Sequence, residues 1–150
     1  AVEPLVELLR TRDGAGKTQA ARALCAIAFN NAANKIAIAR AGAVEPLVEQ
    51  LRTGDVAGKT QAAGAFWALA FNAYNQISIA RTGAVEPLVQ LLRTGDAAGR
   101  TQAAGALRAA GAFWALAFNA YNQISIARTG AVEPLVQLLR TGDAAGKTQA

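Results

Sequence analysis

The hydrophobic positions of the first forty residues predict three helices that are joined by short polar connections. Segment 2–10 has apolar residues at helical spacing, with Pro4 in its first turn, where a missing N–H costs nothing. A longer segment, about 15–30, and a short one, about 33–40, follow it. Short connections are typical of helices that stack against one another. The pattern therefore predicts a three-helix unit.

The long segment of this unit has two different sides when each residue advances by about 100° around a helix. The apolar side, which we expect in the core, consists of Ala21, Leu24 and Ala28. The opposite side, which we expect to face a groove or the solvent, consists of Ala26 and the polar residues Gln19, Arg22 and Asn30. The long helix is therefore the element whose outer side is available for binding.

The three-helix unit recurs along the chain. The phrase AVEPLV begins at Ala1, Ala43, Ala84 and Ala131. A fixed period near 40 residues indicates a stacked repeat array. We therefore expect a single array of about three and a half repeats over residues 1–150. Its expected units are 1–42, 43–83, 84–130 and a truncated 131–150.

The helix ends are marked by the same residue types in each copy. An Asp, a good N-cap, precedes the long helix at Asp13, Asp55, Asp96 and Asp143. Gly54 and Gly95 follow a Thr at the end of the first helix of their units. Gly readily adopts the left-handed conformation that commonly ends helices, so we expect Gly54 and Gly95 to have this conformation.

The third copy differs from the second by a six-residue insertion, 103–108, in its long helix. Six residues turn a helix by about 600°, so the two flanking parts are about 120° out of phase. A straight helix with one continuous apolar stripe is therefore excluded. We expect a kink or bulge between Gly105 and Gly111, or an extra turn that projects beyond the stack.

The repeated unit resembles the armadillo repeat, in its period, its Gly-Ala-Val-x-Pro-Leu-Val entry and its Asn-x-x-x-Ile before the next Gly. This resemblance covers the whole chain apart from the insertion. It implies an all-α fold, a right-handed α-solenoid of three-helix repeats, in which the long helices line a concave groove for extended peptides. In the family an Asn holds the peptide backbone and a Trp flanks it. The Asn position falls here on Ala26, Ala68 and Ala115, and the Trp position on Arg22, Gly64 and Gly111.

The candidate binding residues are therefore other polar and aromatic side chains on the expected concave face. They are Gln19, Arg22, Asn30, Gln61, Trp67, Asn72, Trp114 and Asn119. An alternative stays open for Trp67 and Phe71, which are four residues apart and share one flank of the long helix. They would then pack against the long helix of the neighbouring repeat, and Tyr74 would close the turn into the short helix.

Composition excludes several classes of site. The chain has no His and one Cys, Cys25, which excludes His-dependent triads, His-ligated metal and an internal disulfide. We expect no cofactor or metal, and a lone Cys favours a small core residue in an intracellular protein, cytoplasmic or nuclear. The net charge of +5 is spread as about one copy per repeat of each basic residue, so nucleic acid is an unlikely partner. No apolar run approaches the roughly 18 residues that span a bilayer.

Catalysis is also disfavoured. The pair Glu3 and Glu7 becomes Glu86 and Gln90 in the third copy, as expected for a helix surface. The GAGKT at 14–18 resembles the end of a phosphate-binding loop but lacks its first Gly and its strand. We therefore expect a non-catalytic scaffold that binds a protein or an extended peptide along the concave surface. The alternative is a structural array that self-associates, because neither end has a polar capping repeat and exposed end faces could stack into a homo-oligomer.

Overall fold

A computed structural model describes residues 2–109 of the chain. The first unit consists of α1 (Val2–Arg10), α2 (Gly14–Ala28) and α3 (Ala32–Arg40). These bounds agree with the three helices predicted from the apolar pattern, within two residues at each end. The three-helix unit is therefore confirmed, and it is set by the spacing of apolar side chains.

The same succession of helices follows in the next units. The second unit consists of α4 (Val44–Thr53), α5 (Val56–Ala70) and α6 (Ala73–Arg81). The third begins with α7 (Val85–Thr94) and α8 (Ala97–Ala109). Residues 2–109 contain no strand, so the described part of the chain is all-α. The truncated fourth unit, 131–150, lies outside the described residues.

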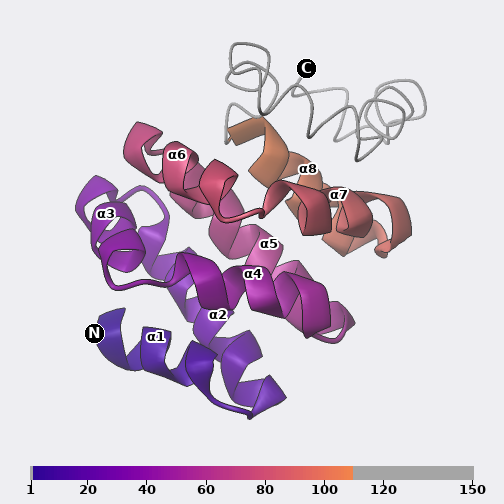
Figure 1. Ribbon diagram of the computed structural model, residues 1–150, viewed down its shortest axis with the longest axis horizontal. Coiled ribbons are helices and arrows are strands. Elements are labelled where there is room, and N and C mark those ends of the chain that lie inside the picture. The colour runs from indigo at the N-terminus through magenta and orange to yellow at the C-terminus, as the bar shows by residue number, and fades with distance from the viewer. Residues whose placement is uncertain (1, 110–150) are drawn as a thin grey trace.

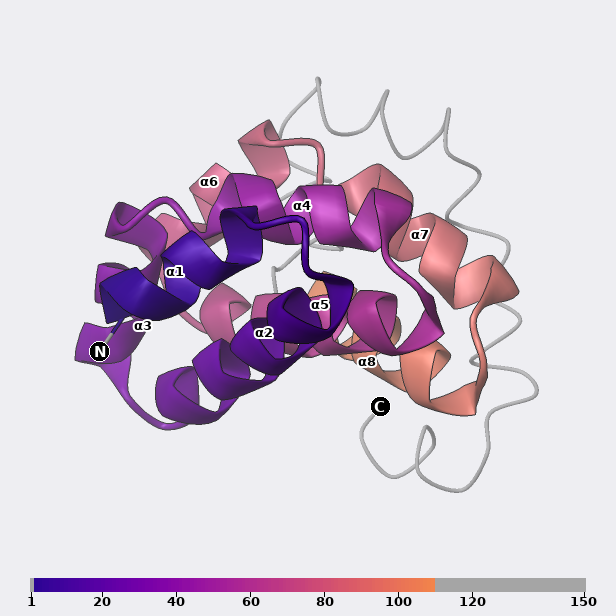
Figure 2. The ribbon, with the colours of Figure 1, turned by 90° about the horizontal axis from the view of Figure 1, so that it is seen from below.

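The helices form layers that run through all three units (Figure 1). Figure 2 shows α1, α4 and α7 side by side in one layer and the long helices α2, α5 and α8 in a second. The short helices α3 and α6 stand together at one edge. This arrangement brings equivalent residues of successive units next to one another.

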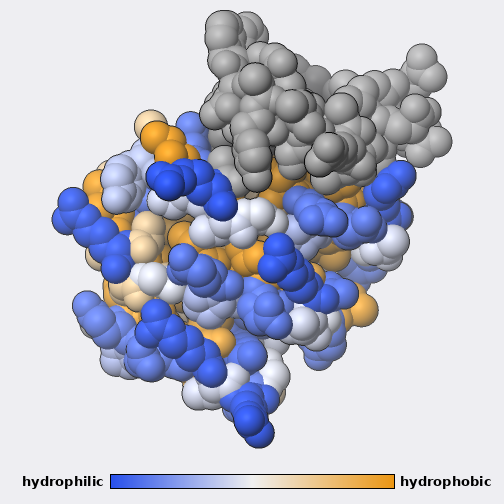
Figure 3. All heavy atoms as spheres, in the orientation of Figure 1, coloured by the Kyte–Doolittle hydropathy of each residue, from blue (hydrophilic) through white to orange (hydrophobic). Residues whose placement is uncertain are grey.

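The core lies between these layers. Its largest fully buried side chains include Leu9, Leu24, Leu47, Phe66 and Leu88, each 1% exposed or less. Burying one such side chain contributes about 2 kcal/mol. The predicted core side of the first long helix is confirmed, because Ala21, Leu24 and Ala28 are buried. Figure 3 looks onto the layer of α1, α4 and α7 from outside the core and shows hydrophilic side chains spread over this outer face.

The predicted Asp caps are confirmed at three long helices. A carboxylate oxygen of Asp13 accepts a hydrogen bond from the backbone N–H of Ala15 at 3.1 Å. Asp55 accepts from the N–H of Gly58 at 2.7 Å, and Asp96 caps α8 in the same way at 2.8 Å. These bonds satisfy N–H groups that the first turn of a helix leaves without a partner.

The conformation predicted for Gly54 and Gly95 is wrong. Their φ and ψ angles are −66° and 161°, and −69° and 163°, which is extended backbone. Glycine is needed there for a different reason, since a Cβ at either position would lie 2.5 Å from the carbonyl oxygen four residues earlier. The left-handed conformation occurs instead at Gly42 and Gly83, with φ of 79° and 76°, just before the next unit.

Helix α8 is continuous through the whole insertion, 103–108, since its residues are helical from Ala97 to Ala109, past Gly105. The described part of the predicted break is therefore unbroken α-helix, and Gly111 lies outside the described residues. The sequence TQAAGA occurs at 60–65 in α5 and at 101–106 in α8, so Gly64 and Gly105 occupy equivalent positions.

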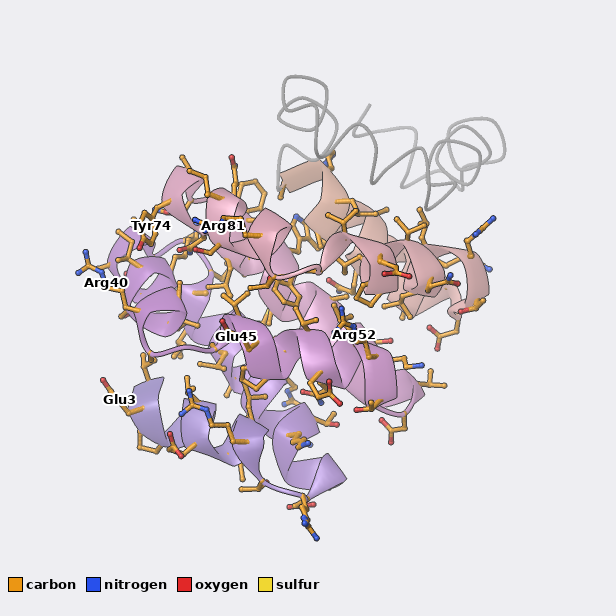
Figure 4. All side chains as sticks on the ribbon, in the orientation of Figure 1. Glu3, Arg40, Glu45, Arg52, Tyr74 and Arg81 are labelled. Atoms are coloured by element: carbon orange, nitrogen blue, oxygen red, sulfur yellow. The ribbon has the colours of Figure 1, made fainter. Side chains whose placement is uncertain are left out.

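Two kinds of polar side chain connect successive units. Arg10 forms an ion pair with Glu7, and its Nη2 donates to the carbonyl oxygen of Ala41 at 3.5 Å, at the entrance of the next unit. Arg52 repeats this placement at the seam between α4 and α7, with Nη2 3.3 Å from where a Cβ of Gly83 would lie (Figure 4). Both arginines therefore reach the turn that begins the following unit.

The second connection is the fully buried Asn75 in α6. Its Nδ2 donates to the carbonyl oxygen of Leu69 at 3.2 Å and to that of Lys35, in the preceding unit, at 3.0 Å. The equivalent Asn34 donates to the carbonyl oxygen of Ile27 at 2.8 Å. The Asn of the predicted Asn-x-x-x-Ile motif therefore ties the short helix to the end of the long helix.

Candidate functional site

The candidate site is the layer of long helices, in which α2, α5 and α8 lie side by side. We call the contact of α2 with α5 the first seam and the contact of α5 with α8 the second seam. Glycines allow the close approach at the start of each helix. A Cβ at Gly58 would lie 3.3 Å from Oγ1 of Thr18, and one at Gly99 would lie 3.2 Å from Oγ1 of Thr60. The two seams therefore have the same arrangement at this end.

The predicted polar residues of the first two units differ in exposure. Gln19 and Arg22 are exposed on α2, as predicted, and so is Ala26. Gln61 on α5, which is equivalent to Gln19, is half-buried. The preceding unit covers part of α5, whereas nothing among residues 2–109 covers the outer side of α2. These glutamines line the long-helix layer on successive helices.

Trp67 lies in the second seam. A Cβ at Gly105 would be only 2.5–2.7 Å from atoms of the Trp67 ring, so the ring lies directly over the backbone of α8. Trp67 is half-buried, and among the described residues its buried Nε1 has no hydrogen-bond partner. The structure thus supports the alternative in which Trp67 packs against the next long helix.

Phe71 does not follow Trp67 into the seam. Helix α5 ends at Ala70, and Phe71 is the residue that caps its C-terminus, 60% exposed. The equivalent Phe29 caps α2 and is 67% exposed. The alternative in which Phe71 packs against the long helix of the neighbouring repeat is therefore wrong, because its side chain is exposed at the end of α5.

Phe29 and Phe71 are exposed where the long helices end, and sequence reasoning did not select either as a site residue. Tyr74 and Ile77 of the short helix α6 are both 61% exposed, and Tyr74 lies at the outer edge of the array (Figure 4). The Nζ of Lys35 lies 5.5 Å from the centroid of the Phe71 ring, within the range of a cation–π contact. Tyr74 was expected to close the turn into the short helix, and its ring is exposed.

Of the three predicted asparagines, Asn72 and Asn30 lie among the described residues, each at the end of a long helix. Oδ1 of Asn72 accepts hydrogen bonds from the N–H groups of Tyr74 and Asn75, at 3.0 and 3.3 Å, and caps α6. Asn31 caps α3 in the same way, so it is the equivalent of Asn72. Asn30 is an additional exposed residue with φ of 54°, a conformation that Asn tolerates better than most residues. The remaining candidates, Trp114 and Asn119, lie outside the described residues.

The positions that carry Asn and Trp in the armadillo family have small side chains in the second unit. Ala68 is 5% exposed and Gly64 is buried. A Cβ at Gly64 would lie 3.2 Å from Oε1 of Gln102 and 3.7 Å from Sγ of Cys25. Neighbouring helices therefore close over these positions, and no large side chain projects from them.

Cys25 fills the first seam where Trp67 fills the second. Its Sγ donates to the carbonyl oxygen of Gly64 at 3.3 Å, and burial raises the pKa of the thiol. A raised pKa disfavours the reactive thiolate at neutral pH. Within residues 2–109, no group of three or more Cys, Asp or Glu side chains is placed to hold a metal ion. In the same range, no helix combines the length and the apolar character that crossing a membrane requires.

The charge on the long helices is of one sign. The sequences of α2, α5 and α8 contain no Asp or Glu, whereas their basic residues are Lys17, Arg22, Lys59, Arg100 and Arg108. Asp13, Asp55 and Asp96 cap these helices and place a carboxylate at the start of each. The helices themselves therefore contribute only positive side-chain charge to a layer of small side chains, with glutamines on successive helices.

Comparison with known protein families identifies this arrangement. The model of the Armadillo/beta-catenin-like repeat matches residues 31–71 and 72–108. The chain belongs to this family. The all-α armadillo solenoid expected from the resemblance is thereby confirmed. A comparison with curated proteins finds no match.

Several solved armadillo-type structures are similar to this chain. An engineered protein from a structural genomics consortium has a TM-score of 0.83 and 34% identity over 97% of this chain. A designed armadillo repeat protein in complex with the peptide (KR)4 has a TM-score of 0.81 and 26% identity over 97% of this chain. Computationally designed armadillo repeat proteins for modular peptide recognition have a TM-score of 0.78 and 30% identity over 96% of it. This chain spans 57%, 59% and 58% of these structures.

Proposed function

We propose that this armadillo chain is a non-catalytic scaffold that binds an extended peptide or protein segment along its long-helix layer. The observation that supports this proposal is the continuous layer of α2, α5 and α8, which presents equivalent side chains at regular intervals. An extended segment that lies across successive helices meets the same chemistry at each unit. Affinity then accumulates along the array, as in other solenoids with extended binding surfaces.

The charge of the layer defines the ligand that we propose. Because α2, α5 and α8 carry basic side chains and no carboxylate, an acidic peptide is favoured over a basic one. The designed relative described above is in complex with (KR)4, a basic peptide. The expected preference here is therefore of the opposite sign. Amide groups of Gln61 and Gln102, which are half-buried on α5 and α8, take the place of the missing family Asn as hydrogen-bonding groups.

Binding of labelled extended peptides tests this proposal. Fluorescence anisotropy with matched acidic, neutral and basic peptides should give saturable binding of the acidic one, weakened by added salt. The variant Q61A should weaken binding about fivefold, since a lost hydrogen bond costs about 1 kcal/mol. The variant Q90A is the matched control, because Gln90 is exposed on α7 in the other layer. Tighter binding of the basic peptide, or equal loss in both variants, would contradict the proposal.

A self-associating array is the second candidate. It is supported by the outer side of α1 and α2, where a hollow of about 420 Å³ is lined mainly by apolar atoms. Light scattering behind size exclusion over a hundredfold concentration range distinguishes the two functions. A constant mass near 15.4 kDa excludes self-association, whereas a mass that climbs with concentration supports it.

A further inference from the structure

Helices α1 and α2 form the end of the array that lies away from the second unit (Figure 1), and residues of both helices line the hollow described above. Its lining includes Leu5, Leu8, Arg22, Ala23 and Ala26. Leu5, Leu8 and Ala23 are half-buried, and Arg22 and Ala26 are exposed. We call this surface the α1–α2 face.

The same face is covered in the second unit. The residues equivalent to those of the α1–α2 face are Leu47, Gln50, Gly64, Ala65 and Ala68. All five are buried, and Leu47 and Ala65 are 0% exposed. What buries them is the first unit, through α1, α2 and α3. The α1–α2 face is therefore the stacking surface of an armadillo unit, and it continues an interface that the chain already forms twice.

The two seams show which side chain such a face accepts. In the first seam Cys25 faces Gly64, and a Cβ at that glycine would lie at an ordinary 3.7 Å from Sγ. In the second seam Trp67 faces Gly105, and a Cβ there would lie 2.5 Å from the ring. A facing Cys thus leaves space for a Cβ on its own side of the glycine, where the tighter approach of 3.2 Å is to Oε1 of Gln102 on the following helix, whereas a facing Trp requires glycine.

The α1–α2 face has Arg22 at the position of these glycines. We propose that this face binds an armadillo unit whose long helix presents a small residue, such as Cys25, and rejects a unit that presents a Trp. The side chain of Arg22 is accommodated beside a small residue and keeps its guanidinium in solvent. Against a Trp, the Arg22 stem would occupy the volume of the ring. Arg22 is thus the residue that determines which unit stacks.

The test adds one copy of residues 1–42 directly before Ala1, which reproduces the natural Gly-Ala-Val junction at 42–44. Two versions are compared, one unchanged and one with C25W in the added copy only. Each is made with Arg22 and with R22G in the original unit. This design varies only the two facing residues.

The unchanged copy should stack on Arg22 and raise Tm by about 3 °C or more. It should also slow amide hydrogen exchange in the original α2 about tenfold. With Arg22 in the original unit, the C25W copy should neither raise Tm nor slow hydrogen exchange in α2. With R22G in the original unit, the same copy should do both. A C25A copy should stack like the unchanged one, because the rule concerns size and not the thiol.

Several results would overturn the proposal. Equal stacking of the C25W copy on Arg22 and on R22G would remove the role of residue 22. No stacking of the unchanged copy would show that the face does not bind such a unit. Loss of stacking in the C25A copy would show that the thiol, and not the size of the side chain, is recognised. Hydrogen exchange in α5 and α8 verifies that every variant is folded.

Discussion

The first and second seams of the long-helix layer share one backbone arrangement but contain different side chains. Thr18 and Thr60 approach glycines of the next helix at nearly equal distances. About two turns further along each helix, Cys25 leaves a Cβ-sized space at Gly64, whereas Trp67 removes it at Gly105. The comparison teaches that the main chain fixes the spacing of units. The side chain at one position then decides how tightly, and with which neighbour, a unit packs.

Removing the side chains that fill the two seams should have the largest effect. The variant W67A should lower the free energy of unfolding by about 3 kcal/mol, because a large ring over a glycine leaves a cavity that nothing else fills. The variant C25A should lower it by about 1 kcal/mol. Urea denaturation followed by circular dichroism measures both. Equal losses would show that the seams are equivalent in spite of their different packing.

Adding a methyl group to the glycine of each seam should destabilise the chain more at the second seam than at the first. The variant G105A should cost about 1–3 kcal/mol, because the new Cβ collides with the Trp67 ring. The variant G64A should cost less than about 1 kcal/mol, since it meets the flexible end of Gln102 and Ala favours the helix. In the W67A background, G105A should no longer destabilise. A full penalty in that double variant would show that the ring is not what G105A strikes.

Removing the Asp caps of α5 and α2 should give a smaller difference in the loss of stability. The variant D55A should cost about 1 kcal/mol, because it removes the bond to the N–H of Gly58 at the start of a helix that is packed on both sides. The variant D13A should cost less, since the bond to Ala15 is longer and α2 is packed on one side within residues 2–109. Thermal denaturation of the two variants provides the comparison. A larger loss for D13A would contradict this ranking.

The smallest expected effect is the pH dependence that comes from the first seam. Burial raises the pKa of the Cys25 thiol, so the folded state holds its proton to higher pH than the unfolded state does. Its contribution is therefore intact below the ordinary thiol pKa and is lost as pH rises toward the raised value. The stability difference between the wild type and C25A should shrink between about pH 8 and 10. A constant difference over this range would show that the thiol does not titrate differently in the fold.

Local patterns of the sequence predicted the helices well. The spacing of Leu5 to Leu9 and the position of Asp13 depend on one segment alone, and both predictions are confirmed. The conformation of Gly54 was predicted wrongly because a close approach and a left-handed turn both select glycine. The backbone, and not the residue type, distinguishes these two causes.

The candidate site was less accessible to sequence reasoning. Whether Trp67 faces solvent or a seam depends on Gly105, which is thirty-eight residues away and belongs to another unit. Phe71 is exposed although it lies four residues after Trp67, directly past the end of α5. Asn30 was a candidate alongside Asn72, but one extra residue in the first unit gives the position equivalent to Asn72 to Asn31. Such details follow from packing between units, which no single segment encodes.

The contact of Asn75 with the preceding unit bears on how such a chain can grow. Its Nδ2 reaches a backbone carbonyl oxygen, that of Lys35, and not a side chain. Any preceding unit offers that oxygen, whatever residue it carries there. For this contact, unlike the seam between Trp67 and Gly105, a gene segment that encodes one unit can therefore be copied and inserted without a matching change in its neighbour. Residues 66–103 and 113–150, which differ only at Arg100 and Lys147, are the kind of duplication that this tolerance permits.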